Sequence, residues 1–195
     1  DLLKAKAAGT AVPVVTTGAG SNEYYGAVIT MNALGIPFKL LTGYKGSSDA
    51  KAGLLRGDGD LAEFSYDTLI ALIDSNKVTP VLQQRSARWS VLKDLPTAAE
   101  LAKQAGSTPA SIDALKAMAD ILALGHAFAG PPGIPADRLT LLQDAFKAAV
   151  NDKTFQSEAT KAKSHIEYGA PSDLQAIVAN GLKQKQTFAS LVKTP

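Results

Sequence analysis

The sequence predicts an α/β fold in which a mostly parallel sheet is flanked by helices. The first observation behind this prediction is that short apolar runs alternate with segments of helical periodicity in the first part of the chain. The second is the composition, because 46% hydrophobic and 19% charged residues are typical of a globular domain. Strands joined by helices pair in parallel, so the loops that follow them share one edge of the sheet. The four expected strands cover residues 12–16, 38–41, 61–64 and 78–82.

The expected helices fall between and after these strands. A first helix ends at Gly9, and the spacing from Thr97 to Glu100 is that of a capping box, which predicts a helix start. The sequence changes character at Gly125, where a brief apolar strand passes into a proline-rich segment that cannot be helical. We expect the chain to cross between two lobes there. The other helices are expected at residues 22–34, 49–56, 111–124, 136–150, 152–162 and 172–187.

Charge and cysteine content argue against several classes of function. The chain carries 20 basic and 18 acidic residues, a net charge of +2, and no block of basic residues interleaved with aromatics. We therefore expect no nucleic-acid partner. Without cysteine there are no thiol nucleophiles, disulfides or cysteine-ligated metals. No stretch is apolar for long enough to span a bilayer, and no positively charged start followed by an apolar run marks a secretory signal in this chain.

The most informative stretch is the turn TGAGS at residues 17–21, between the first expected strand and the helix that follows. Glycine lets backbone N–H groups approach a ligand, and the first turn of a helix offers unpaired donors with a partial positive charge, so an anion can bind there. A second turn, GYKGS at 43–47, follows the next strand, and Ser65 and Tyr66 follow the third. We therefore expect one pocket at this edge. The alternative is that Gly20 and Ser21 form only an ordinary strand-to-helix turn and helix cap.

Several tyrosines lie near these turns. Tyr44 and Tyr66 are the preferred ligand contacts among them, because a tyrosine hydroxyl can donate to a ligand while its ring walls a pocket. Tyr24 can wall the same pocket, whereas Tyr25 is expected to lie in the core. The alternative for all of them is amphipathic packing.

The sequence contains few residues that could form a catalytic site. His126 and His165 are the only histidines, and we expect both to be structural or solvated. There is no G-x-S-x-G elbow, H-E-x-x-H pair or Walker lysine. Gly18 and Gly20 form half of a dinucleotide fingerprint, but Glu23 occupies the third glycine position. We therefore expect no catalytic residues, no cofactor and no metal.

Six motifs, taken in order, resemble the periplasmic substrate-binding proteins of tripartite tricarboxylate transporters, sometimes called the Bug group. The resemblance covers nearly the whole chain, and it is carried by the order of the motifs rather than by any one of them. They are TGAGS (17–21), GIPF (35–38), GYKGS (43–47), GDGD (57–60), DLPTAAE (94–100) and PPGIP (131–135).

The resemblance implies a periplasmic-binding-protein-like fold of type II, in which two α/β lobes surround a cleft. Such a protein is not an enzyme: it captures a small organic carboxylate in the periplasm for a membrane permease. By similarity, one carboxylate group binds at the start of the helix after TGAGS, and the other turns line the rest of the cleft. The implied ligand-binding residues are Thr17, Gly20, Ser21, Asn22, Tyr24, Tyr44, Gly46, Ser47, Ser65 and Tyr66.

Members of this group usually begin with a lobe that carries a glycine-rich loop and an aspartate, which nothing in this chain matches. We therefore expect residues 1–124 to form the second, ligand-binding lobe, and residues 125–195 to be a crossover strand and C-terminal helices of an otherwise missing first lobe. Such a fragment would expose apolar surface and favour self-association. Two other interpretations stay open. One is a phosphate- or nucleotide-binding α/β enzyme domain that uses the turn at 18–21, and the other is a sensory or interaction module that has lost binding.

Overall fold

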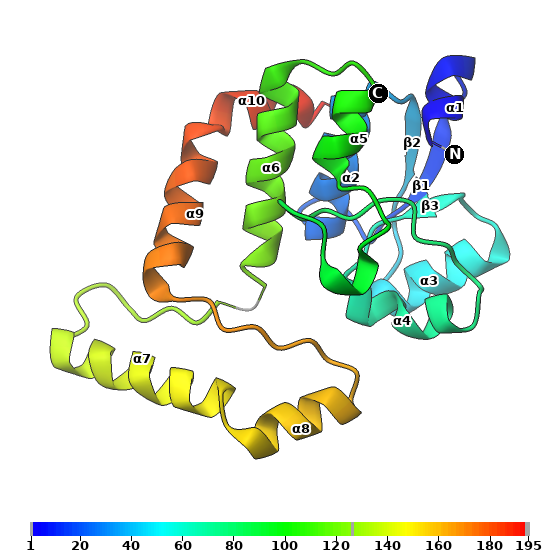
Figure 1. Ribbon diagram of the computed structural model, residues 1–195. Helices are drawn as coiled ribbons and strands as arrows, with labels where there is room; N and C mark the ends of the chain where they lie inside the picture. The colour runs from blue at the N-terminus through cyan, green and yellow to red at the C-terminus, as the bar shows by residue number, and fades with distance from the viewer. Residues whose placement is uncertain (1, 126, 194–195) are drawn as a thin grey trace.

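A computed structural model describes residues 2–125 and 127–193 and contains a three-stranded parallel sheet (Figure 1). The strands are β1 (Val12–Val15), β2 (Phe38–Leu41) and β3 (Leu61–Ala62), in the order β2-β1-β3. In the central strand, Val14 lies opposite Leu40 on one side and Leu61 on the other. The predicted α/β class with a parallel sheet is therefore confirmed.

The connections between the strands run in opposite directions and create a switch point. The helix α2 (Asn22–Leu34) leads from β1 to β2, and α3 (Ser47–Arg56) leads from β2 back past β1 to β3. Right-handed crossovers in opposite directions place their helices on opposite faces of a sheet. In agreement, α3 contacts β1 and β3, whereas α2 packs with Val14 in the main core. The switch point lies between β1 and β3, where ligands bind in open α/β sheets.

The core lies between the sheet and a layer of helices that includes α5 (Ala98–Gln104) and α6 (Pro109–Ala123). The helix α2 is enclosed by the sheet, α5 and α6, which is why most of its residues are buried. Val28, Met31 and Leu34 are fully buried, and burial of each such side chain stabilises the fold by about 1.5–3 kcal/mol. The C-terminal helices α9 (Pro171–Lys183) and α10 (Lys185–Leu191) pack on α6, and α10 also packs on α2.

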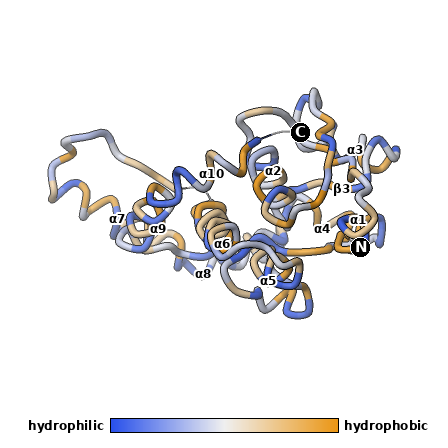
Figure 2. The backbone as a smooth tube through the Cα atoms, turned by 90° about the horizontal axis from the view of Figure 1, so that it is seen from above, coloured by the Kyte–Doolittle hydropathy of each residue, from blue (hydrophilic) through white to orange (hydrophobic). Residues whose placement is uncertain are grey.

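Two helices stand apart from this body. Figures 1 and 2 show α7 (Ala136–Val150) at a distance from the sheet, followed by α8 (Lys153–Lys161). The exposed fractions of Leu141 and Leu142 on α7 are 69% and 55%, and that of Phe128 in the segment before it is 81%. Large apolar side chains are therefore uncovered along α7 and the segment before it, which together with α8 we call the arm. The described helices include none that is both long and apolar enough to cross a membrane.

Several predicted elements are confirmed. The helices α2 and α7 have the bounds predicted for them, and the capping box of α5 is present, with Thr97 and Glu100 bonding each other's backbone N–H. The first helix, α1 (Leu2–Ala8), is followed by Gly9 in the left-handed conformation, as expected.

Other predicted elements are wrong. Residues 78–82 form no strand, because Pro80 removes a ladder donor, and only an isolated bridge from Gln83 to Thr97 follows. The third strand stops at Ala62, two residues early. The brief strand expected from Gly125 is absent among the described residues there, where no neighbouring strand is available to pair with it. The helix expected over 172–187 is divided at Gln184 into α9 and α10.

Candidate functional site

Three helices begin at one edge of the sheet. The helices α2, α3 and α4 (Tyr66–Asp74) follow β1, β2 and β3, and because the strands are parallel, these helix starts meet at the carboxyl edge. Ser21, Gly46 and Ser65 are their N-cap residues. The first turn of each helix directs N–H groups and a partial positive charge toward this edge. The structure therefore brings the three predicted turns to one edge.

The turn at 17–21 has an open glycine backbone. The φ angles of Gly18 and Gly20 are +158° and +96°, and a methyl group built on either would meet no atom within 4 Å. The Ser21 hydroxyl accepts the Tyr24 N–H at 3.1 Å. Helix geometry leaves the N–H groups of the first helical residues, Asn22 onward, without intrahelical partners, so they are oriented for an anion.

Acidic side chains partly neutralise the helix starts. Glu23, Asp49 and Asp67 lie in the first turns of α2, α3 and α4. The Asp49 carboxylate accepts the Lys45 N–H at 3.1 Å, and Asp67 Oδ1 lies 2.9 Å from His165 Nδ1. At the starts of α3 and α4, an acidic side chain therefore already bonds to a protein donor. An added anion meets less competition from acidic side chains at the start of α2, where the glycine turn is open.

Tyr44 lies along α3. Its hydroxyl donates to Asp58 Oδ2 at 2.9 Å, and a methyl group on Gly53 would lie 2.5 Å from its ring carbon Cε1. The hydrogen bond to Asp58 raises the pKa of the Tyr44 hydroxyl and, from the other side, lowers the pKa of Asp58. Arg56 Nη2 also bonds Asp58 at 2.9 Å. The Tyr44 hydroxyl thus has a partner within the chain, and its contact with a ligand remains a prediction.

Tyr66 belongs to an aromatic cluster with Trp89 and His165. Ring centroids lie 5.2 Å apart for Tyr66 and Trp89, 5.6 Å for Tyr66 and His165, and 4.6 Å for Trp89 and His165, all edge to face. The guanidinium of Arg85 lies over the Trp89 ring at 5.2 Å. No local sequence signal marks Trp89 or Arg85, because only the fold brings them to the start of α4. His165 is half exposed and paired with Asp67, whereas His126 lies outside the described residues.

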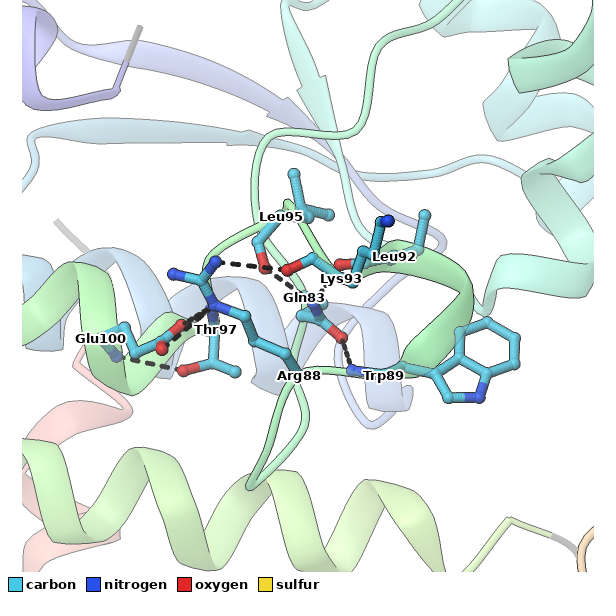
Figure 3. Close-up of polar contacts among 8 residues, drawn as sticks. All are labelled: Gln83, Arg88, Trp89, Leu92, Lys93, Leu95, Thr97 and Glu100. Carbon is cyan, nitrogen blue, oxygen red and sulfur yellow. Dashed lines mark hydrogen bonds and ion pairs between the residues drawn. The ribbon is translucent and has the colours of Figure 1, made fainter.

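A buried glutamine organises the loop that carries Trp89 (Figure 3). Gln83 Nε2 donates to the carbonyls of Leu92 and Leu95 at 2.9 and 2.7 Å, and its Oε1 accepts the Trp89 N–H at 2.9 Å. Arg88 Nε bonds both carboxylate oxygens of Glu100, at 3.1 and 2.9 Å. These bonds fix the loop between Gln83 and α5, and so hold Trp89 near Tyr66.

The environments of Tyr24 and Tyr25 are the reverse of those expected from the sequence. Tyr24 packs against the main core, whereas Tyr25 is 38% exposed, so the prediction that Tyr25 lies in the core is wrong. The two rings meet edge to face at 5.4 Å. The difference follows from the rotation of α2, which no local sequence signal specifies. Ser65 lies at the carboxyl edge, with its hydroxyl 2.8 Å from that of Thr68.

An acidic side chain that the sequence analysis missed lies at the switch point. Glu63 directly follows β3, and its carboxyl group is enclosed beside Gly26 of α2. Burial raises the pKa of this carboxyl well above its usual range. The Gln84 side chain lowers it in part, and the charge of Glu23 raises it further. The part of the chain that the structure describes contains no group of three or more histidine, aspartate and glutamate side chains placed to hold a metal ion.

The arrangement defines an α/β fold in which three helices begin at the carboxyl edge of a parallel sheet. No protein-family model matches the sequence, and no curated protein does. The structure is similar to a TctC solute binding protein from Polaromonas, with a TM-score of 0.64 and 16% identity over 98% of this chain and 59% of that one. It is also similar to an R. palustris protein solved with adipate, with a TM-score of 0.62 and 19% identity over 93% of this chain and 56% of that one. At these identities the likeness establishes the fold, and the chain spans less than two thirds of each solved structure.

Proposed function

We propose that this chain is the ligand-binding part of a non-enzymatic solute-binding protein that captures a small organic carboxylate in the periplasm for a tripartite tricarboxylate-type transporter. The observation that carries the proposal is the meeting of three helix N-termini at the carboxyl edge of a parallel sheet, with an open glycine turn at the α2 end. The fold shared with a solute-binding protein and with a protein solved with adipate supports it.

In this proposal, one carboxylate binds the backbone N–H groups at the turn before α2. Thr17, Gly20, Ser21 and Asn22 would hold it there. The residues proposed to line the remainder of the site are Tyr24, Tyr44, Gly46, Ser47, Ser65 and Tyr66. Among these, Tyr66 and Tyr44 would have to exchange a partner or share it with the ligand, because both contact other side chains.

Magnitudes indicate that this edge binds weakly by itself. A helix terminus stabilises an anion by about 0.3–1 kcal/mol, and a hydrogen bond to a charged group contributes about 1.5–3 kcal/mol. Micromolar affinity needs about 8 kcal/mol after the costs of association are met. We therefore propose that a further lobe closes over the ligand, with residues 1–124 as one lobe and 125–195 returning to the other.

The uncovered apolar arm supports this domain proposal. Among the described residues nothing covers Leu141 and Leu142 on α7, as expected for a surface that packs on another lobe or on a second copy. The helices α9 and α10, by contrast, pack on α6. Within residues 125–195, we therefore propose that α7 and α8 make the contact with the other lobe. Self-association through the arm is checked by sedimentation of the Leu141→Gln/Leu142→Gln variant, which should be the more monomeric form.

The proposal is tested by calorimetric titration of the chain with adipate, succinate and citrate. We expect weak but saturable binding by wild type at high ligand concentration and none by Gly20→Asp, because the new carboxylate would place a like charge at the start of α2. The Gly20→Asn variant is the matched control, since it imposes the same backbone strain without the charge. If Gly20→Asp and Gly20→Asn bind these carboxylates with equal affinity, the turn at 17–21 is not part of the binding site.

Two outcomes would replace the proposal. Thermal stabilisation by nucleotides or phosphate, but not by carboxylates, would assign the turn at 18–21 to a phosphate- or nucleotide-binding enzyme domain. No response of a folded sample to any of these ligands would favour a sensory or interaction module that has lost binding.

A further inference from the structure

Unpartnered polar atoms gather at the switch point between β1 and β3. Among the described residues, three buried side-chain oxygens have no hydrogen-bond partner: Thr16 Oγ1, Glu63 Oε2 and Gln84 Oε1. Thr16 and Glu63 are the next pair beyond the β1–β3 ladder, which ends where Val15 lies opposite Ala62. Buried polar groups are nearly always paired, so three such atoms at one place need a physical explanation.

Gly26 brings Glu63 and Gln84 to the same place on α2. A methyl group on Gly26 would lie 2.5 Å from Glu63 Cδ, so the carboxyl occupies the room that a side chain would fill. Gln84 Nε2 donates to the Gly26 carbonyl at 3.3 Å and to Thr30 Oγ1 at 2.9 Å, which holds the amide against α2 beside Glu63. The unpartnered atoms that remain are oxygens, and a proton on Glu63 turns one of these acceptors into a donor.

The charges around Glu63 also favour its neutral form. From α2, the charged group that acts on it is Glu23, a like charge, while Gln84 from the following loop and Thr16 from β1 carry none. An ionised Glu63 would therefore be enclosed without a cationic neighbour among these elements, which is costly in a low-dielectric site.

The proposed ligand would add a second like charge. An anion at the start of α2 lies at the same edge of the sheet as Glu63, where enclosed charges are poorly screened. Its arrival should raise the proton affinity of Glu63, and by linkage the protonated side chain should raise the affinity for the anion.

We propose that Glu63 holds a proton when an anion occupies the turn at 17–21, so that capture of a carboxylate takes up a proton from solvent over the pH range in which Glu63 of the free protein is ionised. This inference rests on the proposed function, because it concerns the same anion. In this proposal Glu63 is a positioning residue: it does not touch the ligand, but the protein binds the anion more tightly when Glu63 is protonated.

The test is a pH series of calorimetric titrations with adipate, from about pH 6 to about pH 9.5. For wild type, affinity should be constant at the acid end and fall by up to about tenfold per pH unit once Glu63 ionises in the free protein. Heats measured in two buffers of different ionisation enthalpy should then report uptake of up to one proton. The Glu63→Gln variant, a mimic of the neutral acid, should show a flat profile.

Two control variants separate Glu63 from other titrating groups. Glu23→Gln removes the like charge on α2, so it should bind more tightly at the acid end and keep the wild-type slope. The fall in affinity should begin at a lower pH, because Glu23 no longer raises the pKa of Glu63. His165→Gln tests the imidazole paired with Asp67 at the start of α4. A slope that persists in Glu63→Gln and disappears in His165→Gln would assign the proton to His165 and overturn the proposal.

The remaining outcomes are also decisive. Binding by wild type with a flat pH profile and no proton uptake refutes the coupling while leaving the proposed function standing. Absence of binding at every pH refutes the proposed function, and the coupling with it. If Glu63→Gln does not fold, proton counting on wild type together with the His165→Gln profile still decides the assignment.

Discussion

Replacing Gly26 by alanine tests the contact between α2 and Glu63 most directly. In an open helical position, alanine is better than glycine by about 1 kcal/mol. At Gly26 the added methyl would lie 2.5 Å from Glu63 Cδ and would also overlap the carboxylate oxygens. Overpacking of this kind costs about 1–3 kcal/mol, and displacing the carboxyl disturbs the Gln84 bonds to α2. Subtracting the gain in helix propensity leaves a loss of about 0–2 kcal/mol from overpacking alone. With the Gln84 bonds also disturbed, we expect the Gly26→Ala variant to lose about 1–2 kcal/mol in free energy of unfolding.

The sign of this effect should reverse in a second background. In Glu63→Ala the obstacle is gone, so adding Gly26→Ala should stabilise that variant by about 1 kcal/mol through helix propensity. Urea unfolding followed by circular dichroism measures all four proteins. Gly181→Ala is the matched control, because its methyl would meet the movable end of the Ile121 side chain, 2.8 Å from Cδ1. If Gly26→Ala has the same effect with and without Glu63, the enclosed position of that carboxyl is wrong.

Three other outcomes are expected. Ser21→Ala should lose about 1 kcal/mol of unfolding free energy, measured in urea, because the hydroxyl that accepts the Tyr24 N–H is removed. Gln83→Leu should lose about 2–3 kcal/mol and shift the Trp89 fluorescence, since the Trp89 N–H and two carbonyls lose their buried partner. Rising pH should destabilise wild type but not Glu63→Gln. The pKa of Glu63 is higher in the folded than in the unfolded protein, so its contribution to stability is fully present below the unfolded pKa. Between the unfolded and the folded pKa, the free energy of unfolding should fall by up to about 1.4 kcal/mol per pH unit. Urea unfolding curves at several pH values measure this fall.

Local signals predicted the elements whose ends have their own chemistry. Ser21 and Gly35 bound α2, the first through a side-chain cap and the second through a left-handed C-cap with a φ of +65°. The capping box of α5 depends only on Thr97 and Glu100, three residues apart. The positions of the three turns at one edge followed from parallel pairing, which the alternation of strands and helices specifies.

Properties that depend on partners distant in the sequence were not predictable in this way. Residues 78–82 have an apolar pattern suited to a strand, but Pro80 and the lack of a neighbouring strand leave them irregular. An acidic residue after a short strand is usually solvated, and nothing near Glu63 in the sequence indicates that α2 and Gln84 enclose it. The cluster of Tyr66 and Trp89 likewise needs the loop geometry that Gln83 provides.

Three locally unfavourable features meet at the switch point, and together they connect the fold to the proposed site. A glycine inside α2 costs about 1 kcal/mol in helix propensity, an enclosed acid costs more unless it is protonated, and Thr16 leaves a buried hydroxyl without a partner. Gly26 would be replaceable by alanine if Glu63 were not there, and Glu63 would have no room if Gly26 had a side chain. Such mutual dependence does not arise from stability alone, because an apolar pair would satisfy the same space. Natural sequences keep locally unfavourable groups mainly where function uses them, and these three lie at the edge of the sheet where we propose that the ligand binds.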